Sequence, residues 1–215
     1  MRKQTGESYD VFYARGGWQY DRDEELLFLV CRILQPLRLR PGFKLLELGC
    51  GMGFHAGLLH QLGFRVTALD SSASAIQHAQ TCSPGPHFIN IDAHEFLATA
   101  PSDRFDVVFA RGMSWFHHDL TGLQAGSANV PEEMRAIFRT LRPGGCFLLQ
   151  LRTDFSGNVD STTGIIHHTW SDMVRFLRAY GRLLLLTDWQ GLPLCDEQTA
   201  RHYAGNVLAA VERNS

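Results

Sequence analysis

Apolar residues along the chain gather in short runs separated by stretches with helical spacing. The short runs, each followed by turn residues, predict buried strands at 45–48, 64–70, 87–93, 104–112 and 146–151, with two more at 183–189 and 206–212. Spacings of three and four residues predict helices at about 23–37, 130–141 and 170–180. In the first helix, the expected core face is Leu26, Leu27, Val30, Ile33 and Leu34. Strands that alternate with helices favour an α/β fold.

The stretch from Leu45 to Phe54 is the most informative part of the pattern. Its apolar run ends in three glycines at alternate positions, Gly49, Gly51 and Gly53, and Glu47 stands two places before the first. Glycine allows close approach of a ligand, and the helix that follows offers free N–H groups to an anion. The pattern predicts a nucleotide-like ligand at the carboxyl end of the first strand. A dinucleotide fingerprint would need a third glycine at position 54, which holds phenylalanine.

Acidic residues follow the next two predicted strands. Asp70 ends the second strand, where a carboxylate can accept hydrogen bonds from two ribose hydroxyls, and Ser71 to Ser74 then offer hydroxyl caps for a helix. Asp92 ends the third strand, just before Ala93. Further along, Pro131 and two glutamates begin the helix at 130–141, and Pro143-Gly144-Gly145 precedes the fifth strand.

Taken in order, these motifs resemble the class I S-adenosylmethionine-dependent methyltransferases over about residues 41–151. The resemblance implies a seven-stranded, Rossmann-like, doubly wound sheet, mostly parallel, closed by an antiparallel carboxyl-terminal strand. It also implies one domain over 1–215, with an amino-terminal helical cap (1–40), a cofactor-binding half (41–151) and a substrate rim with a carboxyl-terminal β-hairpin (152–215).

The resemblance assigns the cofactor, S-adenosyl-L-methionine, to residues at successive strand ends, with S-adenosyl-L-homocysteine as product. In the family an acid at the position of Asp92 accepts from the adenine amino group, and a neighbouring backbone amide meets the ring. Tyr13 and Arg15 lie in an aromatic segment that resembles amino-terminal covers of the bound cofactor, and Arg15 could equally be a surface residue. The expected cofactor-binding residues are Glu47, Gly49, Cys50, Gly51, Gly53, Asp70, Ser71, Asp92, Ala93, Arg111, Tyr13 and Arg15.

Candidate catalytic residues follow the fourth strand, where ligands bind in open α/β sheets. Oxygen or a protonated amine must lose a proton before it accepts a methyl group, and histidine is suited to take it near neutral pH. His117 is the first candidate for this base and His118 the second. Either could instead cap a helix or pair with Asp119, which could itself cap the next helix. No third ligand nearby supports a metal.

The connection at 152–169 is the second candidate for contact with a substrate. An unstructured segment of this length in a compact domain is usually functional or mobile, so we expect part of a lid or substrate rim. His167 and His168 within it could face a pocket, although a solvated rim is the simpler expectation.

Composition narrows the partners. The net charge of −2 gives no electrostatic footprint for nucleic acid, and no apolar run approaches the length of a membrane span. Residues 1–7 lack the apolar segment of a signal peptide, so a cytoplasmic location is expected. The five cysteines are scattered, which favours reduced structural thiols over a metal site. The oligomeric state is left open.

Three functions are compared. The first is methyl transfer to oxygen or nitrogen of a small molecule by direct displacement. The second is a catalytically silent protein that keeps the fold and binds the cofactor or its product. The third, a nicotinamide oxidoreductase, is disfavoured by Phe54.

Overall fold

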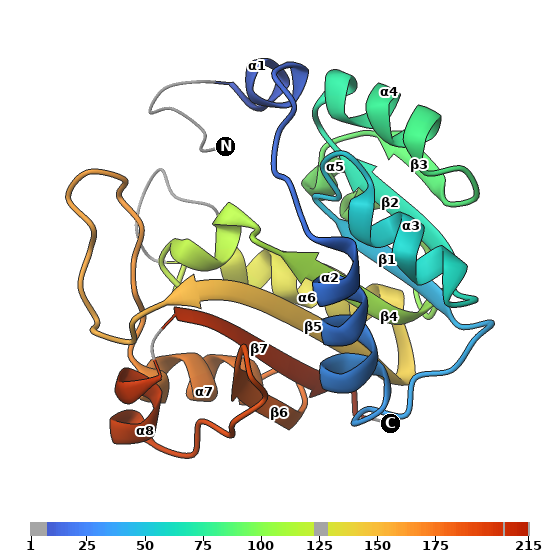
Figure 1. The fold of residues 1–215 in the computed structure, drawn as a ribbon. Helices are drawn as coiled ribbons and strands as arrows, with labels where there is room; N and C mark the ends of the chain where they lie inside the picture. The colour runs from blue at the N-terminus through green and yellow to red at the C-terminus, as the bar shows by residue number, and fades with distance from the viewer. Residues whose placement is uncertain (1–7, 123–128, 204, 215) are drawn as a thin grey trace. The chain divides into compact units, whose positions relative to one another are not determined.

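The computed structural model describes residues 8–122, 129–203 and 205–214 (Figure 1). Seven strands form a sheet in the order β3-β2-β1-β4-β5-β7-β6. This confirms the expected seven-stranded α/β sheet, which is mostly parallel and has an antiparallel strand near its carboxyl-terminal end. Residues 1–7, for which the sequence predicts no signal peptide, lie outside the described residues. Within the described ranges, no helix is long and apolar enough to cross a membrane.

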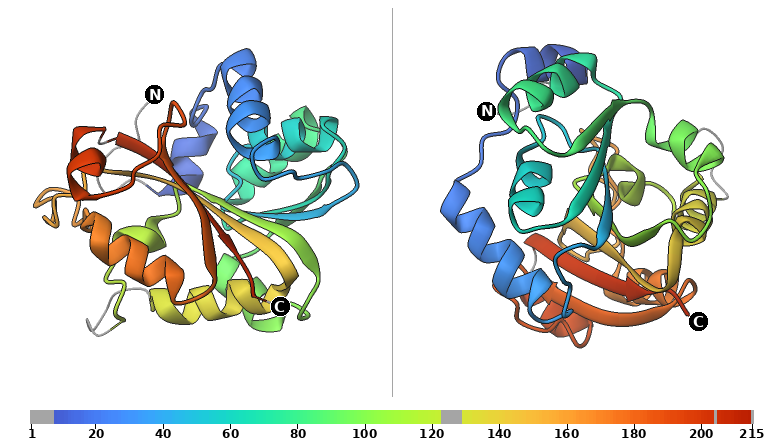
Figure 2. Two further views of the ribbon diagram at one scale, coloured as in Figure 1. Left: turned by 90° about the horizontal axis from the view of Figure 1, so that it is seen from below. Right: turned by 90° about the vertical axis from the view of Figure 1, so that its right-hand side faces the viewer.

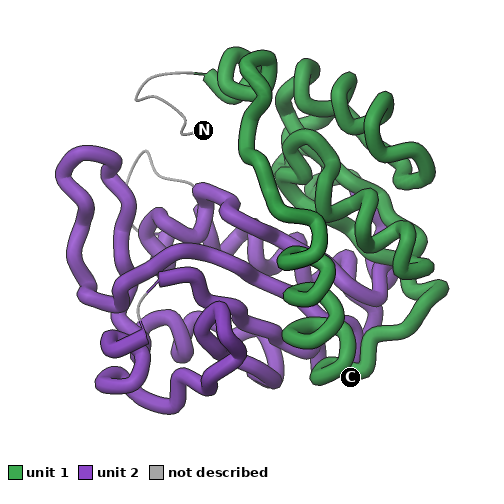
Figure 3. Tube along the Cα trace, in the orientation of Figure 1, with its two compact units in different colours: residues 1–99 green, residues 100–215 purple. Residues whose placement is uncertain are grey.

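Two compact units divide the chain, Met1–Thr99 and Ala100–Ser215 (Figure 3). We call them unit 1 and unit 2 and describe each by itself. The single domain with its three subdivisions, predicted from the sequence, stays a prediction.

Unit 1 contains three parallel strands. In β1–β2 pairing, Lys44 lies beside Arg65, and in β2–β3 pairing, Asp70 lies beside Asn90. Helices α3 and α4 pack on β2, and α4 also contacts β3. The strands are β1 (Lys44–Leu48), β2 (Arg65–Asp70) and β3 (His87–Asn90), and the helices are α1 (Tyr9–Ala14), α2 (Arg22–Phe28), η1 (Leu29–Leu34), α3 (Phe54–Gln61), α4 (Ala73–Cys82) and α5 (Ala93–Thr99). The first three predicted strands are thereby confirmed to within a few residues.

The helix predicted at 23–37 is real but has two parts. An α-helix with an Asp21 cap passes into a π-helical segment, η1. The buried residues are Glu25, Phe28, Leu29 and Ile33, so the buried face already differs from the predicted one within α2, before the π-helical segment begins. Ile33 is buried as expected, whereas Leu27 is 64% exposed and Phe28 and Leu29 are buried in its place. The prediction for Leu27 was therefore wrong.

Unit 2 contains four strands with mixed directions. β4 and β5 are parallel, and β7 is antiparallel to both β5 and β6. Figure 2 shows α7 alongside β6, which it contacts. The strands are β4 (Phe105–Arg111), β5 (Leu141–Thr153), β6 (Arg182–Asp188) and β7 (Gly205–Glu212), and the helices are η2 (Ser114–His117), α6 (Val130–Thr140), α7 (Trp170–Arg178) and α8 (Glu197–His202). This confirms the carboxyl-terminal hairpin and the helices predicted at 130–141 and 170–180.

The connection between β5 and α7 is ordered in a way the sequence did not predict. Residues 154–168, which we call the arm, fold back on themselves through an antiparallel bridge between Val159 and Ile166. The backbone N–H of His167 donates to Asn158 at 2.8 Å, and that of Asp160 donates to Ile165 at 2.8 Å. Residues 154–168 contain no helix or strand, as expected, but the isolated bridge closes them into a turn that the sequence did not predict. Their role as a lid or rim stays a prediction.

Candidate functional site

The glycine loop of unit 1 joins β1 to α3. Gly49, Gly51 and Gly53 have φ values of 68°, 52° and 77°, a left-handed backbone that a side chain would strain. The backbone N–H of Cys50 donates to Leu69 at 2.8 Å and so ties the loop to β2. This geometry explains why glycine occupies all three alternate positions.

Asp70 connects the end of β2 to this loop. Its Oδ2 accepts the backbone N–H of Gly51 at 2.8 Å, and its Oδ1 accepts that of Ser72 at 2.9 Å. Burial raises the pKa of the Asp70 carboxyl, and the two N–H donors oppose that shift. Each carboxylate oxygen can accept a further hydrogen bond. Asp70 can therefore hold the loop and still accept from two vicinal hydroxyls.

Tyr13 covers the glycine loop from α1. A Cβ placed on Gly51 would lie 2.8 Å from the Tyr13 hydroxyl, so the ring and the loop backbone are in close contact. Burial, together with the charge of Asp70, raises the pKa of the Tyr13 phenol, which stays a hydrogen-bond donor at neutral pH. The expectation that the aromatic segment covers the bound cofactor stays a prediction.

A cluster of hydrogen bonds holds α1 in this place. Oδ1 of Asp10 accepts the hydroxyl of Ser72 at 2.6 Å and the hydroxyl of Ser74 at 3.1 Å. The Ser74 hydroxyl also lies 2.9 Å from the carbonyl oxygen of Asp10, so it can donate either to that oxygen or to the carboxylate. These bonds lower the pKa of the Asp10 carboxyl, the Ser72 hydroxyl contributing most. The sequence pattern pointed to the serines as helix caps but gave no signal for Asp10.

The remaining predicted cofactor residues of unit 1 differ in exposure. Glu47 is buried within β1, and Ala93 is buried at the start of α5. Asp92 lies just beyond β3, exposed, and accepts the backbone N–H of His94 at 2.8 Å. Ser71 is exposed, while its neighbour Ser72 is the buried cap of α4. Arg15 is exposed at the end of α1.

These features fit an adenosyl cofactor. Gly51 leaves room for the Tyr13 ring to pack against the loop, and the Asp70 carboxylate keeps accepting capacity for ribose hydroxyls. Cys50 is buried, and burial raises the pKa of its thiol well above the usual value, so it is a packing residue rather than a nucleophile. The loop does not support a nicotinamide oxidoreductase, because the third glycine of a dinucleotide fingerprint is replaced by Phe54, the first residue of α3.

Unit 2 contributes Arg111 and two histidines after β4. The guanidinium of Arg111 lies 4.9 Å from the centre of the Trp189 ring, which is a cation–π contact. His117 ends the short helix η2, and His118 follows it, half-buried. Asp119, expected as a possible helix cap or histidine partner, accepts from the N–H and hydroxyl of Thr121.

His117 is held in its neutral form. Burial lowers its pKa to about 4, and the nearby rings of His167 and His168 add to the shift. Its Nδ1 atom is buried and has no hydrogen-bond partner within the described ranges. A base with so low a pKa accepts a proton only weakly at neutral pH, since the best general bases have a pKa near the working pH.

His168 is the residue whose importance the sequence did not reveal. It is 8% exposed, and its Nε2 atom is buried with no hydrogen-bond partner within the described ranges. Burial lowers its pKa, while the backbone of His118 and the carboxylates of Asp172 and Asp119 oppose the shift. The expectation of a solvated rim was wrong for His168, because a paired motif in a connection carries no periodicity that would indicate burial.

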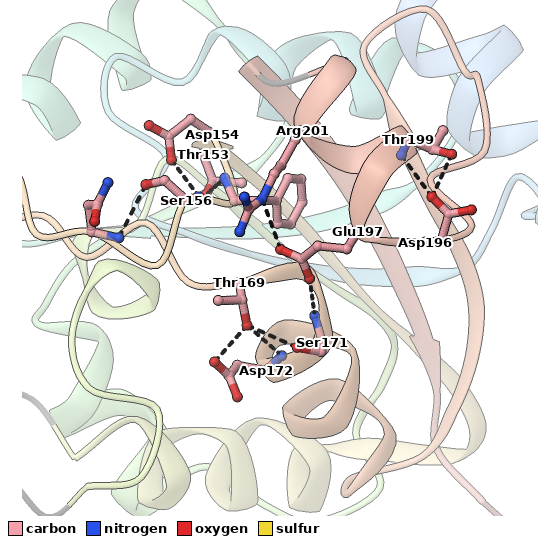
Figure 4. Close-up of polar contacts among 12 residues, drawn as sticks. Thr153, Asp154, Ser156, Thr169, Ser171, Asp172, Asp196, Glu197, Thr199 and Arg201 are labelled. Carbon is pink, nitrogen blue, oxygen red and sulfur yellow. Dashed lines mark hydrogen bonds and ion pairs between the residues drawn. The ribbon is translucent and has the colours of Figure 1, made fainter.

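Hydrogen bonds hold the first residues of the arm in place. Phe155 is fully buried with a left-handed φ of 54°, and its backbone N–H donates to the Thr153 hydroxyl at 3.2 Å. The N–H of Ser156 donates to Asp154 at 2.8 Å, and the N–H of Asp154 donates to Nδ1 of His167 at 3.3 Å. Figure 4 shows the contact between Ser156 and Asp154.

The far end of the arm is fixed at the beginning of α7. The Thr169 hydroxyl donates to Asp172 at 2.6 Å and accepts the Asp172 backbone N–H at 3.1 Å (Figure 4). Ser171 donates its backbone N–H to Glu197 at 3.4 Å, and Arg201 donates to the same carboxylate at 3.2 Å. Polar contacts therefore hold the arm at both of its ends, and His168 directly precedes the contacts at the second end.

The described residues contain no group of three or more histidine, cysteine or acidic side chains arranged to hold a metal ion. All five cysteines are free; Cys50 and Cys146 are buried, and Cys82 and Cys195 are exposed.

Comparisons with known proteins agree with this geometry. The sequence model of the family described as "Methyltransferase domain" matches residues 46–149. Malonyl-[acyl-carrier protein] O-methyltransferase of Serratia marcescens is 28% identical over 108 residues, covering 50% of this chain and 38% of the relative. An S-adenosyl-L-methionine-dependent Diels-Alderase of Talaromyces variabilis is 28% identical over 151 residues, covering 67% and 48%. This chain spans about half the length or less of these two relatives.

Solved structures share the fold. The crystal structure of the [4+2]-cyclase SpnF superposes with a TM-score of 0.69 and 19% identity, covering 98% of this chain and 95% of the cyclase. At that identity the likeness concerns the fold alone.

Proposed function

Because this chain belongs to the class I S-adenosylmethionine-dependent methyltransferases, we propose that it transfers a methyl group to an oxygen or nitrogen atom of a small molecule. S-adenosyl-L-methionine is the cofactor that this family membership assigns. The single observation that carries the proposal is the joint geometry of Asp70 and Gly51, in which a buried carboxylate holds the glycine loop and can still accept further hydrogen bonds. The cofactor supplies an electrophilic methyl group when bound.

The residues of the chain then have distinct tasks. Asp70 accepts from the ribose hydroxyls, Gly51 and its neighbours allow close approach, and Asp92 and Ala93 are the proposed contacts of the base. Tyr13 closes the loop against water, which favours a displacement that depends on alignment. A histidine after β4 or on the arm takes the proton of the acceptor.

A small molecule is the proposed acceptor. The net charge of −2 offers no broad positive surface for nucleic acid. Among the relatives, one is named as an O-methyltransferase of a malonyl group on acyl-carrier protein, which is an oxygen acceptor. A cytoplasmic location remains part of the proposal.

The second candidate is a protein that binds the cofactor without transferring its methyl group. It is favoured by one observation, the 28% identity to a protein named as an S-adenosyl-L-methionine-dependent Diels-Alderase. In that case the glycine loop and Asp70 would still bind the cofactor. The cofactor would keep its methyl group, and the substrate would undergo a different reaction.

Two measurements test the proposal. Titration calorimetry should show binding of S-adenosyl-L-homocysteine and none of a nicotinamide dinucleotide; the reverse preference would contradict the methyltransferase assignment. Conversion of S-adenosyl-L-methionine to S-adenosyl-L-homocysteine should then require a pool of small metabolites. Binding without conversion in every pool would support the second candidate.

A further inference from the structure

We propose that His168 and His117 form a subsite of unit 2 that binds an uncharged hydroxyl group of the methyl acceptor, with His168 taking its proton. This inference rests on the proposed methyl transfer and deepens it, because it names the class of acceptor and moves the base from the segment after β4 to the arm.

The first argument is the state of two nitrogen atoms. Nε2 of His168 and Nδ1 of His117 are both buried, and neither has a hydrogen-bond partner among the residues that the structure describes. Burying a polar atom without a partner costs free energy, so nearly all such atoms in folded proteins are satisfied by protein, water or ligand. Two of them in histidines that influence one another indicate a polar ligand.

The second argument is which nitrogen carries the proton. The backbone of His118 acts to raise the pKa of the His168 ring, and the backbone of Ile166 acts to raise that of the His117 ring. A backbone group acts in this direction when its carbonyl accepts from the ring, so we assign the proton of each ring to the nitrogen toward that carbonyl. In the neutral ring the other nitrogen then has a bare lone pair. Both free nitrogens are therefore acceptors, and their ligand must be a donor.

The third argument is that the two rings are positioned by the backbone. The N–H of Ile166 donates to the carbonyl of His117 at 2.9 Å, which joins the returning side of the arm to the end of η2. His168 follows two residues later, immediately before the Thr169 anchor of α7. The pair is thus held by main-chain bonds and does not depend on flexible side-chain contacts.

The fourth argument concerns charge. The titratable groups that act on the pair are the neighbouring rings of His118 and His167 and the carboxylates of Asp119 and Asp172. Both carboxylates already accept hydrogen bonds, from Thr121 and Thr169 respectively. Burial holds both rings neutral, and the same desolvation would penalise an ammonium group. An uncharged alcohol, phenol or enol is the acceptor that such a site favours.

The division of labour follows from the same surroundings. The pKa of His117 falls to about 4, so this ring is a hydrogen-bond acceptor that stays unprotonated. Two carboxylates oppose the lowering of the His168 pKa, and they can stabilise the imidazolium that forms when His168 takes up a proton. In the step, the O–H bond of the acceptor breaks and its proton bonds to Nε2 of His168. The oxygen electron pair bonds to the methyl carbon, and the carbon–sulfur electron pair stays on sulfur.

A direct test uses the full chain with labelled histidine. In ¹⁵N spectra at pH 7 with S-adenosyl-L-homocysteine bound, His168 should be neutral with the proton on Nδ1. Benzyl alcohol should shift the Nε2 signal of His168, whereas its isosteric cation, benzylammonium, should not. A proton on Nε2, a charged ring at pH 7, or a response to benzylammonium alone would overturn the inference.

A matched pair of variants separates the acceptor from the base. His168→Asn keeps a donor toward the His118 carbonyl and removes the ε nitrogen, while His168→Gln places an amide oxygen near it that accepts but cannot act as a base. Benzyl alcohol binding should fall at least 10-fold in His168→Asn and by less than 3-fold in His168→Gln. His202→Gln, at an exposed histidine of α8, is the control and should match wild type. Equal binding by all three variants would refute the subsite.

Turnover completes the test and keeps the two proposals distinct. With a hydroxyl acceptor, His168→Gln should lower kcat roughly 100-fold with little change in KM, and should flatten the acidic limb of the pH profile. Transfer to amines but never to hydroxyl compounds would overturn this inference and leave the proposed function standing. If no acceptor is ever methylated, the proposed function fails, and the spectra with benzyl alcohol still decide whether the subsite exists.

Discussion

The carboxylate of Asp70 accepts the backbone N–H of Gly51 at 2.8 Å, although the two residues lie 19 positions apart in the chain. The bond joins the end of β2 to the loop that follows β1, so the acid proposed to hold the ribose also shapes the loop that admits it. Cofactor affinity and loop geometry should therefore depend on the same side chain.

Replacement of Asp70 should weaken cofactor binding. Asp70→Ala removes both acceptor oxygens and should cost about 1–3 kcal/mol of binding free energy for S-adenosyl-L-homocysteine. Asp70→Asn keeps one acceptor oxygen and should lose less. Titration calorimetry measures both, with Glu24→Gln at an exposed position of α2 as the control. Wild-type affinity in Asp70→Ala would remove this carboxylate from the site.

Glycine 51 should tolerate no side chain. In Gly51→Ala the new Cβ would lie 2.8 Å from the Tyr13 hydroxyl on a backbone with φ of 52°, so affinity for S-adenosyl-L-homocysteine should drop at least 10-fold. Gly42→Ala is the matched control, because Gly42 also has a positive φ but has nothing within 4 Å. Its affinity should be unchanged. Adding Tyr13→Phe to Gly51→Ala removes the nearest atom and should restore part of the loss.

The attachment of α1 should depend on Asp10. Asp10→Ala removes the acceptor for the hydroxyls of Ser72 and Ser74, so residues 9–14 should exchange their amide hydrogens faster. Hydrogen exchange followed by mass spectrometry measures this, and α5 provides an internal reference in the same unit. Unchanged exchange in α1 would show that the Asp10 carboxylate does not hold this helix in place.

Much of the fold could be predicted from the sequence because each element has a local signal. The run Leu45 to Leu48, the cap Ser72 and Pro131 mark strand and helix ends through backbone chemistry that acts over a few residues. The π-helical turn after Phe28 could not be predicted, since it depends on packing and has no sequence signal of its own. Leu27 was misplaced for a different reason, because α2 buries Glu25 and Phe28 and so turns Leu27 outward before the π-helical segment begins.

The candidate site divides in the same way. Gly51 and Asp70 stand at strand ends, where the fold itself brings them together, and their pairing was foreseeable. The burial of His168 depends on the folding of the arm through Val159 and Ile166, a contact between residues that no periodicity relates. Only the structure could distinguish His168 from His167.

The protein should become less stable as the pH falls, because buried histidines then have to take up protons. The pKa of His117 is about 4 when folded, against about 6.5 in an unfolded chain, so between these values the unfolded state binds more protons. Stability that is present above pH 6.5 is therefore lost as the pH falls toward 4. Allowing for its partial exposure, His117 should contribute about 2 kcal/mol to this loss.

Urea unfolding at pH 7 and pH 4.5 measures that contribution. His117→Gln, which cannot take up a proton in this range, should show a smaller loss between the two pH values than wild type. His202→Gln, at an exposed histidine, should behave as wild type does. An equal loss in wild type and His117→Gln would show that other groups cause the pH dependence.

Methyl transfer itself is tested most directly with a donor that carries a deuterated methyl group. The protein is incubated with this donor and a fractionated pool of small metabolites, and mass spectrometry follows both products. The account predicts one hydroxyl compound that gains the deuterated methyl group, in an amount equal to the S-adenosyl-L-homocysteine formed, and much less of it with Asp70→Ala. A donor that binds at the glycine loop yet remains intact with every fraction would contradict the account.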